Sequence, residues 1–173
     1  MTFTDDLIRA AVRTGEYSDP AAERHLADVL IKRRDTVGRV YLTAVNPVVD
    51  LRLDASGSLT FGNAAVAAGF AEAPASYHAI WSRFDNATGA ASHIADTQST
   101  TTRFAAPGDL PSQAGSFIEI SISAESAEHA AWQQPVLTHF RRDAGGWTLV
   151  GLQRLPDPSN AARPAMQTSK GGR

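Results

Sequence analysis

The amino-acid sequence predicts an α+β fold in which two N-terminal helices pack on an antiparallel β-sheet or a small β-sandwich. The hydrophobic period changes from about 3.6 residues before Asn46-Pro47 to about 2 residues after it. The second half consists of short apolar segments separated by Gly, Pro, Asp and Ser turn signals. No long helical pattern lies between these segments, which argues against a parallel doubly wound sheet.

Two helices are expected, over residues 4–15 and 19–44. Thr4 is a suitable N-cap for the first, and Gly15 a suitable stop. The second begins with Asp19 as N-cap and Pro20 in the first helical position. The helical period assigns it one apolar face, expected to point toward the core and made of Ala22, Leu26, Val29, Leu30 and Val37.

The β region is expected over residues 48–155. It opens with a hairpin in which Val49, Leu51 and Leu53 alternate with polar residues before a turn at residues 54–57. Residues 64–69 form a stretch of small side chains in which no third helix is predicted. The remaining strands are predicted at residues 77–84, 96–104 (as an edge strand), 117–123, 136–142 and 147–154.

The chain is expected to form a single domain over residues 1–155, followed by a disordered tail. A length of 173 residues with 43% hydrophobic residues is typical of one globular domain with its own core. The final segment, residues 156–173, holds three Pro and two Gly and no apolar period. Such a composition cannot bury enough apolar surface to offset the entropy of ordering the chain.

Composition excludes several classes of function. The absence of Cys removes thiol nucleophiles, thiolate metal sites and disulfides. A net charge of -2 predicts neither nucleic-acid nor anionic-membrane binding, and no apolar run approaches the roughly 20 residues of a membrane span. No signal peptide precedes the first helix, so we expect a cytoplasmic protein as the sequence stands, or an exported one if it belongs to a longer precursor.

No motif in the sequence identifies a catalytic or metal centre. The five histidines lack the i, i+2 or i, i+4 spacing that places two ligands on one face of a strand or helix. Nucleophile-elbow, phosphate-loop and dinucleotide-binding motifs are also missing from the sequence. We therefore assign no catalytic residue, and we expect no metal and no cofactor.

The segment at residues 77–86 is the richest in residue types that bind ligands. Tyr77 and Trp81 offer flat apolar area, while Arg83 and Asp85 offer charged hydrogen-bonding groups. These four residues, with His139 of the final hairpin, are the candidate ligand-binding residues. The alternative interpretation is that Trp81 belongs to the core and that Arg83 and Asp85 pair at the end of a strand.

Four segments carry a resemblance to other proteins: FTDDLIRA at residues 3–10, TGEYSDPAA at 14–22, LIKRRD at 30–35 and WSRFDN at 81–86. They resemble the C-terminal region of large, uncharacterised and often exported bacterial proteins, over residues 3–154. The resemblance implies an accessory domain beside a larger N-terminal region. It brings no established activity and therefore no catalytic residue.

Two hypotheses of function follow. The first is a non-catalytic accessory or interaction domain that contacts a protein partner or an N-terminal domain of the same protein. The second is a small pocket-bearing enzyme or ligand carrier, of the cone-shaped kind typified by nuclear transport factors. The first predicts a filled core and an exposed patch or sheet edge as the contact surface, whereas the second predicts a concave cavity lined by convergent polar groups, with Trp81 exposed to solvent beside Arg83 and His139.

Overall fold

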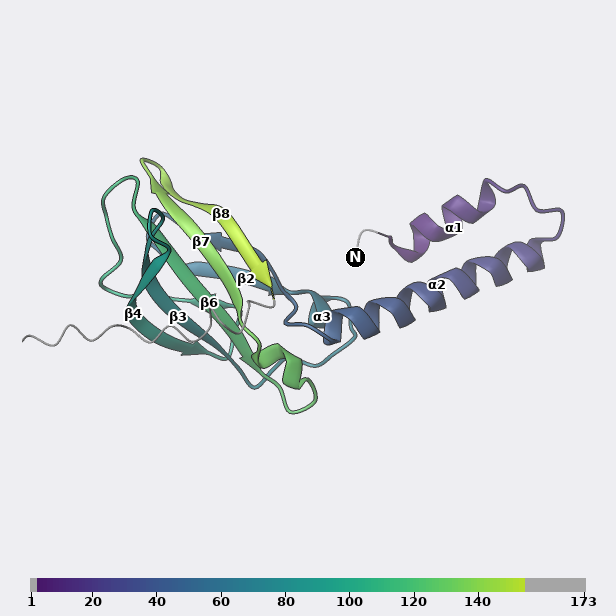
Figure 1. Ribbon diagram of the computed structural model, residues 1–173. Helices are drawn as coiled ribbons and strands as arrows, with labels where there is room; N and C mark the ends of the chain where they lie inside the picture. Colours follow the sequence, from purple (N-terminus) through teal and green to yellow (C-terminus); the bar gives the residue numbers. More distant parts are fainter. Residues whose placement is uncertain (1–2, 155–173) are drawn as a thin grey trace, which may run out of the picture.

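The computed structural model describes residues 3–154 and confirms the α+β class (Figure 1). Helices α1 (Asp5–Arg13) and α2 (Pro20–Thr43) come first and run antiparallel to one another. They agree with the expected boundaries to within two residues. The tail expected at residues 156–173 lies outside the described residues.

Two antiparallel sheets follow the helices. The sheet of three strands has the order β1-β2-β5, and the sheet of five strands has the order β4-β3-β6-β7-β8. Their bounds are β1 Val48–Leu53, β2 Leu59–Asn63, β3 Ser76–Asp85, β4 Ala90–Ser99, β5 Arg103–Phe104, β6 Phe117–Glu125, β7 Val136–Asp143 and β8 Gly146–Arg154. Two short helices, α3 (Ala64–Ala67) and the 3₁₀ helix η1 (Ala130–Gln133), lie in the connections.

Two expectations for the middle of the chain were wrong. The single edge strand expected at residues 96–104 is two strands: β4 starts earlier, at Ala90, because it pairs along the whole of β3, and β5 pairs with β2 instead. A third helix, α3, also forms within the small-residue segment. It begins there because the Asn63 side chain accepts hydrogen bonds from the backbone N–H groups of Ala65 and Val66, both at 3.1 Å.

The core fills the space between the two sheets. Alternate residues of β6, Ile118, Ile120 and Ile122, are fully buried, as the period-2 pattern predicts. They pack in one apolar cluster with side chains of β1 and β2, including Leu59. Trp81 is also fully buried and lies opposite Ile120 on β3, so its indole is part of the core.

Asn46 joins the end of α2 to the β region. Its side chain is 3% exposed, and its Nδ2 donates hydrogen bonds to the carbonyl oxygens of Ile122 (2.9 Å) and Gln134 (3.0 Å). The backbone carbonyl oxygen of Asn46 accepts a hydrogen bond from the Arg154 guanidinium at 2.7 Å. The same guanidinium donates to the backbone carbonyl oxygen of Val48 at 2.5 Å. This junction therefore holds together α2, β1, β6 and β8.

The α1–α2 pair projects away from the β region as a helical hairpin (Figure 1). The expectation that the face with Leu26, Leu30 and Val37 points toward the core was wrong. The buried residues of α2 are Ala27 and Ile31, whereas Leu30 is 39% and Val37 49% exposed. Helix α1 lies along α2 and covers one of its sides, and no strand within residues 3–154 covers the stripe that the period had assigned to the core.

Replacing Asn46 by Ala should lower the free energy of unfolding by about 2–3 kcal/mol, because two buried carbonyl groups lose their donor. Urea unfolding followed by circular dichroism measures this change. Asn86→Ala is the matched control: Asn86 is exposed, so its replacement should change the free energy by less than about 0.5 kcal/mol. Equal effects of the two substitutions would show that Asn46 is not the junction we describe.

Candidate interaction surface

The turn between the two helices is fixed by local chemistry. The Asp19 carboxylate accepts a hydrogen bond from Ala21 N at 2.8 Å and caps α2. A side chain at Gly15 would place its Cβ 2.6 Å from the ring of Tyr17, so this position needs glycine if Tyr17 is to keep its place. The turn therefore sets Tyr17 beside the end of α1.

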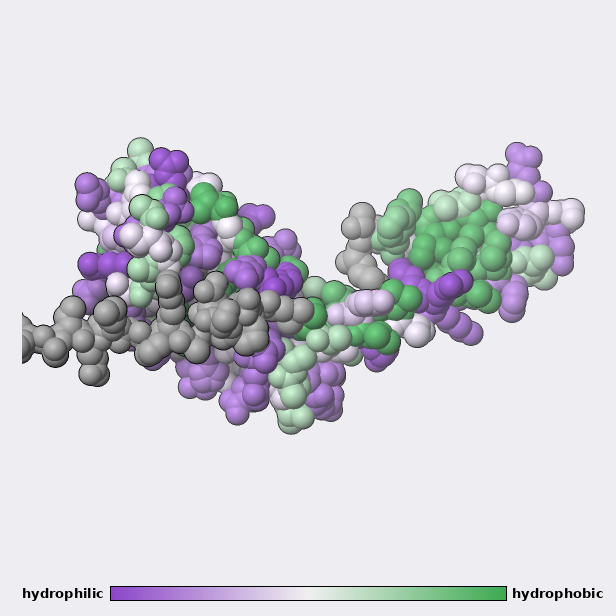
Figure 2. Space-filling view, viewed as in Figure 1, coloured by the Kyte–Doolittle hydropathy of each residue, from purple (hydrophilic) through white to green (hydrophobic). Residues whose placement is uncertain are grey.

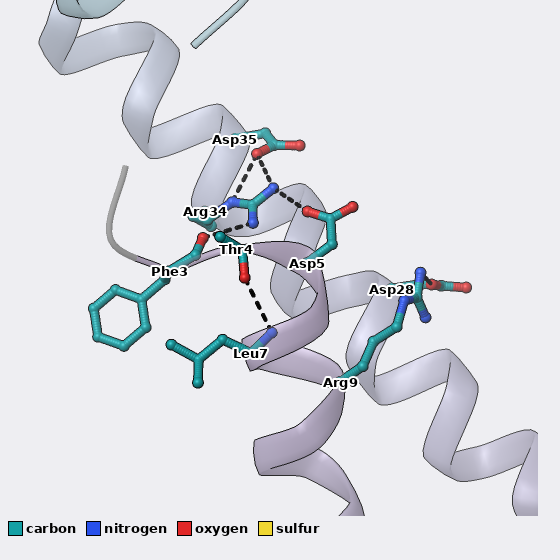
Figure 3. Close-up of polar contacts among 8 residues, drawn as sticks. All are labelled: Phe3, Thr4, Asp5, Leu7, Arg9, Asp28, Arg34 and Asp35. Atoms are coloured by element: carbon teal, nitrogen blue, oxygen red, sulfur yellow. Dashed lines mark hydrogen bonds and ion pairs between the residues drawn. The ribbon is translucent and has the colours of Figure 1, made fainter. Parts of the chain in front are cut away.

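Ion pairs hold α1 against α2 (Figure 3). Arg34 of α2 donates to the carboxylates of Asp5 at 2.7 Å and Asp35 at 2.6 Å, and to the carbonyl oxygen of Phe3 at 2.8 Å. Hydrogen bonds to Asp35 and then to Asp5 raise the pKa of Arg34 above its ordinary value. A second pair joins Arg9 and Asp28 at 2.8 Å. The charges between the helices are therefore largely neutralised within the hairpin.

An apolar groove lies along the hairpin, with a volume of about 710 Å³. It is lined by Phe3 before α1 and by residues of α1, of the turn and of α2: Leu7, Ile8, Ala11, Val12, Thr14, Gly15, Tyr17, Leu26, Leu30 and Arg34. The hydrophobic surface of this face gathers over α1 and α2 (Figure 2). Phe3 is 64% and Leu7 47% exposed, and both line the groove, so they form part of a contiguous apolar patch.

The groove contains one charged side chain, Arg34, and its guanidinium is already paired with Asp5 and Asp35. An occupant would therefore meet apolar side chains and no uncompensated charge. Burying an unpaired charge is costly, so the occupant must itself be apolar where it enters. The groove therefore fits the apolar surface of a protein better than a charged or strongly polar small molecule.

Tyr77 and Trp81, two of the five candidate ligand-binding residues, point into the core. The Trp81 indole donates to Thr97 Oγ1 at 2.8 Å, and the Tyr77 hydroxyl accepts a hydrogen bond from Asn63 at 3.1 Å. Burial raises the pKa of Tyr77 above its ordinary value. Neither side chain is available to a ligand.

Arg83 and Asp85 lie near the end of β3 but do not pair with each other. The Arg83 guanidinium donates to the carbonyl oxygen of Asp109 at 3.3 Å. The Asp85 carboxylate accepts hydrogen bonds from the backbone of Ala87 and Thr88, and these lower its pKa. Asp85 thus stabilises the turn between β3 and β4.

His139 lies on the opposite face of the five-stranded sheet from Trp81. Its Nε2 is 3.1 Å from Oε2 of Glu119, and its ring packs against Phe84 with centroids 4.5 Å apart. It borders a shallow pocket of about 280 Å³, together with Phe84, Asn86, Phe117, Val150 and Gly151. The five candidates therefore do not form one site.

The histidines and carboxylates of residues 3–154 form no metal centre. In the part of the chain that the structure describes, no three His, Asp or Glu side chains gather as a metal-binding group. Two further histidines face single carboxylates: His93 faces Asp96 at 3.0 Å and His78 faces Glu125 at 4.0 Å. Among residues 3–154, no helix has the length and apolar character needed to span a membrane.

Comparison with protein-family models, with curated proteins and with solved structures finds no match for this chain. Its function must therefore be inferred from its own geometry. In that geometry the apolar groove of the helical hairpin, at about 710 Å³, is larger than the pocket beside His139, at about 280 Å³.

Replacing Arg34 by Gln should loosen α1 from α2, because the substitution removes the ion pair with Asp5 and the hydrogen bond to Phe3 O, the two contacts that Arg34 makes across to the α1 side. We expect several-fold faster amide hydrogen exchange within residues 5–13, measured by mass spectrometry. Arg33→Gln makes the same change one residue earlier, at an exposed Arg that forms no ion pair within residues 3–154. Unchanged exchange in the Arg34 variant would contradict the role that we give to this residue.

Proposed function

We propose that this chain is a non-catalytic interaction domain whose helical hairpin binds a protein partner through its apolar groove. The observation that carries the proposal is the groove itself, with Phe3, Leu7, Tyr17 and Leu30 exposed along it. Contiguous apolar surface of this kind on a soluble protein marks a binding site. The expectation that the domain is an accessory module of a larger bacterial protein, which the sequence resemblance implies, is part of this proposal.

The filled core supports the same proposal. Trp81 is buried, and the interior side chains of both sheets belong to one apolar cluster. A cone-shaped carrier needs a concave cavity lined by convergent polar groups, and Trp81, Arg83 and His139 do not converge on one. The pocket-bearing alternative therefore loses support in the form in which the sequence suggested it.

One observation favours small-ligand binding as a second candidate function. The pocket beside His139 combines a half-buried His–Glu pair with the rings of Phe84 and Phe117. Its volume of about 280 Å³ is at the lower limit for a ligand site, so we rank it below the hairpin. A ligand bound there should raise the melting temperature of the wild type but not that of His139→Leu.

A photo-cross-linking amino acid at Tyr17 tests the interaction function in the cells that encode the protein. Tyr17 is 43% exposed and lines the groove, so benzoylphenylalanine at this position should join the chain to a protein partner. Mass spectrometry of the purified adduct identifies that partner. The control position is Ile80, which is 47% exposed on β3 and distant from the hairpin in the fold. No adduct at Tyr17, or equal adducts at both positions, would refute the proposal.

A further inference from the structure

We propose that the occupant of the groove is the helical hairpin of a second copy of this chain, so that two hairpins form a four-helix bundle with two-fold symmetry. The inference rests on the proposed function and names its partner. It follows from the packing of the hairpin, from the shape of its apolar face, from the exposed apolar area and from the distribution of charge.

The packing of the hairpin is incomplete. Within it, only Val12, Ala27 and Ile31 are buried apolar residues. Helix α1 has 9 residues, and a helix of that length is marginal in water without tertiary packing. Antiparallel helix pairs are commonly completed by a second pair around a shared apolar core. The hairpin therefore corresponds to one of the two helix pairs of such a four-helix bundle.

The apolar face has a groove, and beside it stand side chains that could fill the groove of a second copy. Phe3, which precedes α1, and Leu7 of α1 point to the same side in Figure 3, and both line the groove. In a two-fold interface the same patch is used by both partners, so each patch must be complementary to itself. A face that carries protruding side chains beside a groove meets this requirement, since each copy can insert into the other.

The exposed apolar area is large enough for an interface between copies. Phe3, Tyr17 and Tyr41 are 64%, 43% and 70% exposed. At about 150–250 Å² for an aromatic side chain, these three alone expose on the order of 350 Å². Five aliphatic side chains of the same hairpin are also exposed: Leu7, Val29, Leu30, Val37 and Val40. The total approaches the roughly 800 Å² that each partner contributes to a standard interface.

The distribution of charge favours contact between hairpins over other contacts between copies. Residues 4–44 carry seven acidic and seven basic side chains, whereas residues 45–154 carry ten acidic and six basic ones. Two β regions therefore repel each other, and two hairpins have no net charge to oppose their approach. Helix α2 has 24 residues and is about 36 Å long, so paired hairpins can keep the acidic β regions apart.

Sedimentation equilibrium of the full chain provides the first test. We expect the wild type at about 50 μM to have twice the monomer mass of 18.4 kDa, and Leu7→Asp/Leu30→Asp to have the monomer mass. Asp at position 7 lies in the first turn of α1, where a negative charge favours the helix, so circular dichroism should show the helices retained. Val150→Asp changes an exposed apolar residue of β8 and should leave the dimer intact.

A single cysteine placed in the groove provides the second test, because the chain contains no other Cys. Ala11 is exposed and lines the groove, so alkylation of Ala11→Cys should slow at least fivefold as the protein concentration rises from about 0.1 to 50 μM. Alkylation of Val150→Cys should stay constant. This readout does not require the acidic variant to fold.

A monomeric wild type would overturn the second copy as the occupant. So would a dimer that leaves Ala11→Cys fully reactive, since the copies would then meet through another face. Protection independent of concentration would mean that part of the same chain, such as residues 155–173, covers the groove. Each of these results leaves the interaction function open to its own test, because a Tyr17 adduct with a different protein would support that function alone.

Discussion

The hydrogen bonds of Asn46 are the constraint on which the rest of the structure depends. This one buried side chain, with the guanidinium of Arg154, satisfies carbonyl groups of β1, β6 and the segment before β7 at the point where α2 ends. Buried amides and carbonyls that lose their partners are expensive, so the geometry at this point tolerates little change. Among residues 3–154, α2 is attached to the β region near its C-terminal end. The contacts at that end therefore set the direction in which α2 extends from the β region.

The division of roles between the two parts of the molecule follows from this attachment. The two sheets bury their apolar faces against each other, and Trp81, Tyr77 and the isoleucines of β6 fill the interior. The β region thus supplies nearly all of its own core, to which the hairpin adds Leu42 near the C-terminal end of α2. Helices α1 and α2 are left with each other, and their ion pairs, led by Arg34, fix the hairpin without covering its apolar side. Among residues 3–154, neither the β region nor the hairpin covers this apolar side, which is why we propose it as the binding surface.

How far the sequence could predict the structure depends on whether a feature is local. The caps at Thr4 and Asp19 and the alternation of Ile118, Ile120 and Ile122 depend on neighbouring residues, and the structure confirms them. The candidate site depended on distant pairings. His139 faces away from Trp81 because of the strand registers across β3, β6 and β7, which no periodicity reveals. The short helix α3 was missed because its signal is a single Asn cap before four residues.

The error about α2 carries the most information on function. Its buried residues, Ala27 and Ile31, follow immediately after Leu26 and Leu30, so the two stripes are about 100° apart around the helix. A helix packed on one side only would have polar residues at the second stripe. The sequence has leucine there, and the stripe continues to Val37. Helix α1 covers one of these two apolar stripes, and the second hairpin that we propose would cover the other.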